Sequence, residues 1–159
     1  MTQKPTTLIS PELRESKGHW GEVRRSPPVS TSDIRKWAIA TYWPETPPPL
    51  FWDEVYAANT RWGGIIAPQD FNPFAWSIHR TIFESAPTPG GLTSLNGGQV
   101  ETYGAPQRPR DVIAERTRVQ DFNERQGRFG LMLYVFVETE WTNQAGKFVR
   151  RRVSTFIRY

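Results

Sequence analysis

The segment FGLMLYVFV, residues 129–137, constrains how the rest of the chain is arranged. It is apolar at nearly every position, so a strand formed here would be buried on both of its faces. Residues 112–122 before it and residues 148–159 after it are also strand candidates, and the turn-like segments 123–127 and 142–146 separate the three. The sequence therefore predicts an antiparallel meander whose middle strand spans residues 129–141 and is central because of its apolar part, residues 129–137.

The last of these strand candidates alternates in polarity. Its apolar positions are Val149, Val153, Ile157 and Tyr159, and the arginines Arg150, Arg152 and Arg158 alternate with them. Such alternation is typical of a strand with one buried and one solvated face. We therefore expect Arg150–Arg152 to be solvated residues near a sheet edge that do not form a single basic patch.

Helical signals fill the first half of the chain. A short helix is expected after Ser10, and a longer one after Ser30, where Asp33 completes a capping-box pattern and apolar residues recur at helical spacing up to Tyr42. Four prolines in residues 43–50 predict a stiff, extended connection.

Two further helices are expected in the middle of the sequence. Asp53 is a candidate N-cap for a helix over residues 53–62, and another helix is expected over residues 73–83. Residues 85–98 are rich in Pro, Gly and Ser and predict a loop. Strands near residues 22–30 and 99–103 bring the expected total to about five.

Helices followed by a meander indicate an α+β fold. The chain of 159 residues fits one domain. We expect residues 1–20 to form an N-terminal arm and residues 21–159 to form the domain.

Composition excludes several kinds of site. The chain has no cysteine, which excludes disulfides, zinc–thiolate centres and a thiol nucleophile. Its two isolated histidines, without an HExxH string, argue against a metal site. No apolar run is long enough for a signal peptide or a membrane helix, so a cytoplasmic protein without a membrane partner is expected. The net charge of +4 is a weak sign of nucleic-acid binding and also suits a phosphorylated ligand such as coenzyme A.

Three strings in the sequence match a known family. They are FWDEVYAANTRWGGIIAPQ at residues 51–69, NGGQ at 96–99 followed by PQRPRD at 106–111, and ETEWTNQAG at 138–146. In this order they resemble the MaoC-like dehydratases, most closely the FAS1-like, N-terminal type of hot-dog domain, over residues 18–159. The resemblance implies a single hot-dog fold, in which a curved antiparallel sheet of about five strands wraps around a central helix.

The family resemblance also implies a reaction. Its usual members are dimers that add water reversibly across a trans-2-enoyl-CoA to give an (R)-3-hydroxyacyl-CoA. An Asp and a His act together as acid and base, and a backbone amide at a helix N-terminus polarises the thioester carbonyl. No cofactor is implied, since the coenzyme A thioester is the substrate.

The sequence departs from this pattern at the acid–base pair. Pro49 and Leu50 match the family motif, but Phe51 stands where the histidine belongs and Thr46 stands where the first aspartate belongs. Phenylalanine cannot exchange protons, so the usual dyad is absent. Three weak catalytic candidates remain: Glu45 as a displaced carboxylate, Asp53, whose alternative role is the helix N-cap, and His79, whose alternative role is structural.

The resemblance also indicates substrate-binding candidates. Gly63, Gly64, Ile65 and Ala67 match the family's Gly-Gly-Ile-Ile-Ala-Pro string, where glycines allow a ligand to approach closely or end a helix. Arg108 matches the turn before a strand and could meet a coenzyme A phosphate. Arg110 replaces the family's glycine in that turn, which puts the usual tight geometry in doubt.

Three functions remain open. In the first, the chain is the non-catalytic subunit of a heterodimer or heterotetramer with a catalytic MaoC-like hot-dog chain, and its degenerate site makes room for a long fatty-acyl or steroid-side-chain enoyl-CoA. In the second, it is a self-sufficient hydratase or thioesterase that uses a carboxylate. In the third, it is a binding module for acyl thioesters or nucleic acid without chemistry of its own.

Overall fold

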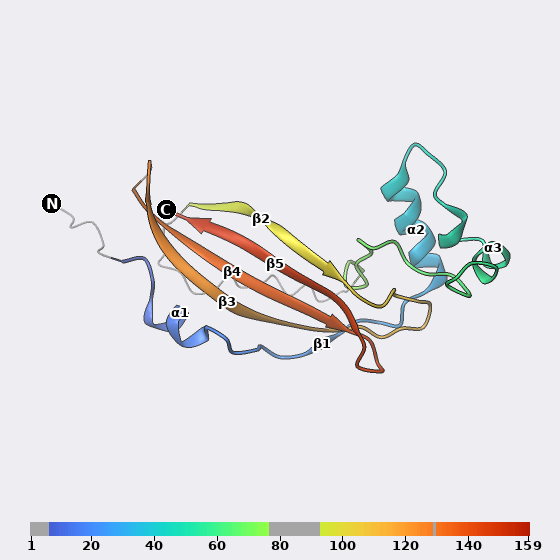
Figure 1. The fold of residues 1–159 in the computed structure, drawn as a ribbon, viewed down its shortest axis with the longest axis horizontal. Helices are drawn as coiled ribbons and strands as arrows, with labels where there is room; N and C mark the ends of the chain where they lie inside the picture. Colours follow the sequence, from blue (N-terminus) through green and yellow to red (C-terminus); the bar gives the residue numbers. More distant parts are fainter. Residues whose placement is uncertain (1–6, 77–92, 129) are drawn as a thin grey trace.

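A computed structural model describes residues 7–76, 93–128 and 130–159. Five strands form a curved antiparallel sheet in the order β1-β3-β4-β5-β2, and the helices α2 and α3 lie beyond one end of it (Figure 1). The strands are β1 Arg24–Arg25, β2 Ser94–Tyr103, β3 Ala114–Gly127, β4 Gly130–Thr142 and β5 Phe148–Arg158. This arrangement confirms the α+β class and the single hot-dog sheet.

The strand β4 lies at the centre of the sheet, as its apolar sequence predicts. It pairs with β3 from Thr142 to Gly130 on one side and with β5 on the other. The predicted turn at residues 123–127 is wrong, because β3 continues to Gly127. Cross-strand pairing with β4 therefore outweighs the turn-favouring residues of this segment.

The strand β2 begins earlier than the sequence predicts. Residues 94–98 were expected to lie in a loop but belong to this strand, whose register with β5 shifts between Asn96 and Gln99. A side chain at Gly97 would lie 2.8 Å from Thr155 Cγ2, so the glycine allows close strand approach at this irregularity.

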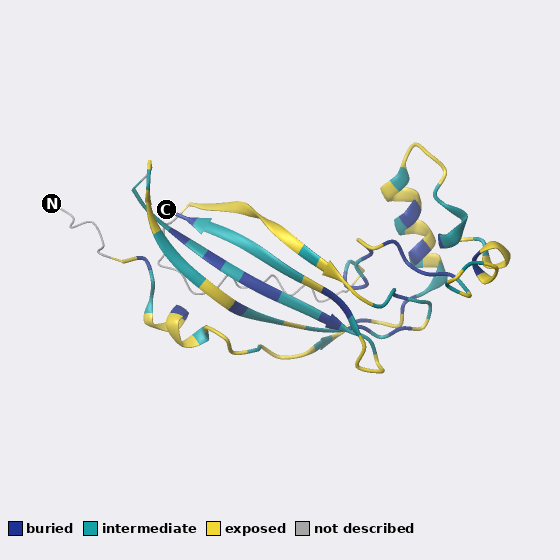
Figure 2. Ribbon diagram, in the orientation of Figure 1, coloured by how far each residue is buried: buried dark blue, intermediate teal, exposed yellow. Residues whose placement is uncertain are grey.

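Alternate residues of β4 build the core on one face of the sheet. Leu133, Val135 and Val137 are buried there, and the buried bands of β4 are visible in Figure 2. The helix α1, Pro11–Ser16, packs against this face through the fully buried Leu13. The predicted arm therefore contributes to the core of the sheet, while the expected domain boundary at residue 21 stays a prediction.

A second core lies under the helices beyond the sheet. It joins α2 (Thr31–Tyr42), the 3-10 helix η1 (Pro49–Phe51) and α3 (Glu54–Ala58) with the buried segment 65–67. The predicted caps are present: Ser30 Oγ accepts from Asp33 N at 3.0 Å, and Asp53 Oδ1 accepts from Tyr56 N at 2.9 Å. The helix α3 is shorter than the predicted 53–62.

The helix expected over residues 73–83 lies mainly outside the described residues. Its described part, residues 73–76, has turn geometry, and Phe74 contacts Trp141 on the sheet with ring centroids 5.7 Å apart.

The arginines of β5 correct the expectation of solvated edge residues. Because β2 pairs with the outer side of β5, the strand lies inside the sheet. Arg150 and Arg158 are only 4% and 8% exposed, and Arg151 lies on the opposite face from Arg150.

The turn at residues 108–111 is tight although Arg110 stands where the resemblance implies a glycine. Arg110 has a φ of +74°, in the left-handed region, and its N–H donates to Val29 O at 2.7 Å. Asp111 closes the turn by accepting from Arg108 N at 2.8 Å. Tertiary hydrogen bonds thus hold an arginine in a conformation that favours glycine.

Replacing Arg110 by glycine should therefore stabilise the protein. The left-handed conformation costs a non-glycine residue about 1–2 kcal/mol, which glycine avoids. Because glycine loses more backbone entropy on folding, only part of this gain remains, and Arg110→Gly should raise the free energy of unfolding by roughly 0.5–1 kcal/mol. Urea unfolding measures it. Arg110→Ala keeps the Cβ atom and is the control, with no stabilisation expected; an equal gain in both variants would contradict the explanation.

Candidate functional site

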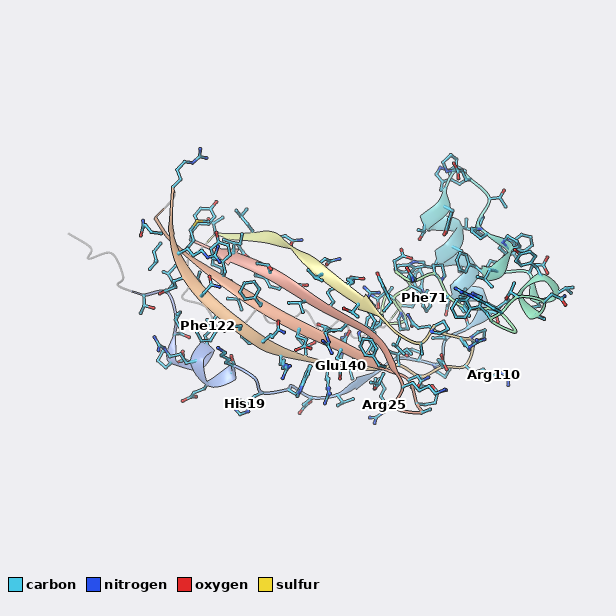
Figure 3. All side chains as sticks on the ribbon, viewed as in Figure 1. His19, Arg25, Phe71, Arg110, Phe122 and Glu140 are labelled. Carbon is cyan, nitrogen blue, oxygen red and sulfur yellow. The ribbon has the colours of Figure 1, made fainter. Side chains whose placement is uncertain are left out.

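Two segments distant in the sequence meet at the end of the sheet nearest α2. Ala67 N donates to Gln107 O at 2.8 Å, and Gln107 Nε2 donates to Phe71 O at 3.1 Å. Arg108 Nη2 donates to Trp62 O at 2.7 Å. Figure 3 shows Phe71 between the sheet and α2, with Arg110 beyond it. The Gly-Gly-Ile-Ile-Ala-Pro segment is thus held against the turn that follows β2.

A small cavity of about 90 Å³ lies between these two segments. Its lining includes Trp62, Ala67, Tyr103, Gln107 and Arg150. Gln107 is 5% exposed, and its Oε1 has no hydrogen-bond partner. Leaving a buried acceptor unpaired costs free energy, so the cavity is suited to a ligand or water that can donate to Gln107.

A larger cavity of about 450 Å³ lies over the sheet near the same end. The strand register places most of its lining on one face, the face that also carries Val137. Its described lining includes Glu115, Thr117, Thr139, Trp141, Arg150 and Arg152. Arg150 borders both cavities, so its side chain forms part of the wall between them.

Glu101 on β2 organises the charges at this wall. It accepts from Arg150 Nη2 at 2.9 Å and from Arg152 Nε at 2.6 Å, and Tyr103 Oη also donates to it. Partial burial raises the pKa of Glu101, but the hydrogen bonds from Tyr103 and Arg152 and the two positive charges outweigh burial and bring the pKa below its ordinary value.

Arg150 is the most buried charge of this cluster. Its side chain is 4% exposed, and its guanidinium lies 4.6 Å from the centroid of the Trp141 ring. Burial lowers the pKa of Arg150 from its usual value. Arginine nevertheless stays protonated in proteins, so this cation must be stabilised by Glu101 and the aromatic ring.

The structure does not bring the catalytic candidates together. Phe51 is a core residue, 9% exposed, with its ring 6.0 Å from that of Tyr42. Asp53 caps α3, and Glu45 is exposed. Among the described residues none of these three lines either cavity. His79 lies outside the described residues.

The substrate-binding candidates divide between two places. Ala67 lines the small cavity, whereas Gly64 and Ile65 line a third cavity of about 570 Å³ next to Arg110. Gly63 has a φ of +63°, and Arg108 holds the carbonyl of the preceding residue, Trp62. The structural roles of Gly63 and Arg108 are therefore clear from their contacts, and a role in binding stays a prediction for all five residues.

Among residues 7–76, 93–128 and 130–159, no three His, Cys, Asp or Glu side chains lie close enough to share a metal ion. In the same residues no helix is long and apolar enough to cross a membrane.

Comparison with known proteins adds the family. Residues 16–152 match the model of the FAS1-like, dehydratase domain region. The chain belongs to this family. The search of curated proteins found no match to this chain.

Solved structures share its fold. R-hydratase PhaJ1 from Pseudomonas aeruginosa is 21% identical, with 94% of this chain and 84% of that chain covered and a TM-score of 0.62. A chain of the ChsH1–ChsH2 complex from Mycobacterium tuberculosis is 15% identical, with 92% of each chain covered and a TM-score of 0.68. A chain of the HadBC (3R-hydroxyacyl-ACP dehydratase) complex from the same organism is 22% identical, with 86% of this chain and 95% of that chain covered and a TM-score of 0.61.

Sequence reasoning missed the cluster of Glu101, Arg150 and Arg152 in this member of the FAS1-like dehydratase-domain family. Each arginine alone resembles a solvated strand residue, and the sequence does not say which strand flanks β5 on its outer side. The one available signal is a lone carboxylate, Glu101, in the strand candidate 99–103, opposite a strand with alternating arginines. Only the register, which pairs Glu101 with Arg152, turns that signal into a contact.

Removing the charge of Glu101 should destabilise the protein at neutral pH. Glu101→Gln leaves Arg150 buried without its carboxylate, which should lower the free energy of unfolding by about 1–3 kcal/mol. Because the folded-state pKa of Glu101 is lowered, the wild-type advantage is complete above the unfolded-state pKa of about 4.3 and is lost as the pH falls through the folded-state pKa.

Urea unfolding at pH 7 and below pH 4 tests this dependence. Glu140→Gln is the matched control, because Glu140 is similarly covered but pairs with the partly exposed Arg116, and a loss below about 1 kcal/mol is expected there. A Glu101→Gln loss that is equal at both pH values would show that the charge is not the cause.

Proposed function

We propose that this chain is the non-catalytic, substrate-accommodating subunit of an (R)-specific enoyl-thioester hydratase or 3-hydroxyacyl dehydratase. A separate MaoC-like hot-dog chain would carry the Asp/His pair. Family membership supports a reaction of the hydratase or dehydratase type. The observation that supports the non-catalytic role is that Phe51 is buried in a hydrophobic core.

Phe51 occupies the position of the family's histidine and is integrated into a hydrophobic core. It packs with Tyr42, and the same core includes Ile34 and Ala57. A proton-transferring group at this position would need an imidazole that faces a ligand cavity. Glu45 is exposed, and Asp53 caps α3. Their carboxylates therefore provide no substitute acid–base pair at the described cavities.

A partner subunit is supported by the free edge of the sheet. Among the described strands β2 pairs only with β5, and most of its residues are exposed (Figure 2). An exposed edge of this length is a site for pairing with another strand. Two of the similar structures are complexes by their names, ChsH1–ChsH2 and HadBC, which supports a heteromeric assembly as a heterodimer or heterotetramer.

The proposed ligand is an acyl-CoA thioester, with no other cofactor. A long fatty-acyl or steroid-side-chain group fits the proposal, because a subunit without catalytic side chains can devote its share of the site to the acyl group. Ala67 and the neighbouring Gln107 border the cavity that a thioester arm would enter, and Gln107 Oε1 is available to accept a hydrogen bond there.

Hydration assays test the subunit role. The purified chain alone should hydrate crotonyl-CoA and longer enoyl-CoA esters at least about 100-fold more slowly than its complex with a catalytic hot-dog chain, since acid–base catalysis contributes roughly 10²–10⁴-fold. The partner is obtained by co-purification from the native cell.

Variants of the weak candidates sharpen the assay. Glu45→Gln and Asp53→Asn in this chain should leave the hydration rate of the complex within about twofold of the wild-type rate. Loss of the partner's acid–base pair should instead reduce that rate by roughly 10²–10⁴-fold. Normal hydratase rates from the isolated chain, abolished by either variant, would refute the subunit assignment.

A further inference from the structure

The cavity of about 450 Å³ over the sheet carries an excess of positive charge at its wall. Arg150 and Arg152 both bind Glu101 and share this one carboxylate, so the trio has a net charge of +1. Glu101 also accepts from Tyr103 and from Gln99 Nε2, so its oxygens are already heavily used. The second cation therefore has no carboxylate of its own within this trio.

Other charged groups at the cavity do not cancel this excess at close range. Glu115 pairs with Arg24 at 2.5 Å and accepts from Trp141 Nε1 at 2.8 Å. Arg116 pairs with Glu140 at 2.6 Å. Glu22 also lines the cavity but is exposed, so water and salt screen its charge.

The two arginines differ in how they can meet a ligand. Arg152 lines the cavity; 38% of its side chain is exposed, and its Nε donates to Glu101. Arg150 is buried, and its Nη1 has no hydrogen-bond partner. A buried donor without a partner is unfavourable, and a guanidinium rotation that presents Nη1 to the cavity would allow a bound acceptor to relieve it.

We propose that this cavity binds an anionic oxygen group, a carboxylate or a phosphate, through Arg152 and Arg150. Guanidinium groups form charge-assisted hydrogen bonds with both kinds of anion, and a single negative charge would balance the trio. The two sources of such a group are an acyl chain that ends in a carboxylate and a phosphate of the coenzyme. The inference does not depend on the proposed subunit role, because the cavity and its charges belong to this chain alone.

Small anions test the site without any activity measurement. The full chain, at low salt, is titrated with octanedioate, with octanoate, with inorganic phosphate and, for neutral comparison, with octanol, while the tryptophan indole signals in ¹H–¹⁵N spectra are followed. At least one of the anions should saturate, with octanol leaving the Trp141 signal unchanged, and binding should weaken as salt is added. Saturation by the carboxylates alone assigns an acyl-chain carboxylate, and saturation by phosphate alone assigns the coenzyme phosphate.

Three arginine variants locate the binding. Arg152→Gln should weaken the binding of the anion that saturates the wild-type site at least about tenfold, as expected for the loss of a charge-assisted hydrogen bond. Arg150→Gln should do the same. Arg151→Gln is the matched control, because its side chain faces the opposite side of β5 and pairs with Glu138, and it should leave the affinity within about twofold.

The outcomes separate cleanly. If Arg150→Gln does not fold, Arg152→Gln decides, because its partly exposed side chain tolerates replacement. Wild-type protein that binds no anion, or equal weakening by Arg151→Gln and Arg152→Gln, overturns the anion site. Neither result touches the subunit role, which the hydration assays decide by a different measurement.

Discussion

The insertion of β5 between β4 and β2 is the constraint on which most of this structure depends. It gives β5 hydrogen-bonding partners on both sides, and it buries arginines that the sequence alone places at a solvated edge. Burying a cation is costly unless a carboxylate and hydrogen bonds compensate. Glu101 lies on β2 opposite Arg152 and supplies that carboxylate. The strand order therefore determines which charges line the cavity.

The same end of the sheet gathers segments that are distant in the sequence. The Ile-Ala-Pro segment and the turn after β2 meet through backbone hydrogen bonds, and Arg108 fixes the chain just before the paired glycines. Left-handed backbone at Arg110 shows how strongly these tertiary contacts hold the turn. The cavities therefore lie in a framework held by several independent hydrogen bonds.

The proposed function rests on the family of the chain, on the burial of Phe51 and on the exposed sheet edge. The chain belongs to the family of the FAS1-like, dehydratase domain region, and Phe51 packs in a hydrophobic core. Among the described strands β2 pairs only with β5, and this edge is the feature on which the proposed pairing with a second chain rests. The positive wall adds a means of recognising an anionic part of the ligand.

The sequence by itself determined the family, the α+β class, the central position of β4 and the caps at Ser30 and Asp53, because these depend on local patterns and on ordered motifs. It also predicted that Phe51 stands at the histidine position of the family motif, and the structure shows this residue in a hydrophobic core. Only the tertiary structure decided where β2 and β3 begin and end, that Arg150 is buried, and that Glu101 serves two arginines. The reason is physical: strand order and register are settled by contacts between distant segments, and a residue's neighbours across a sheet cannot be read from its neighbours along the chain.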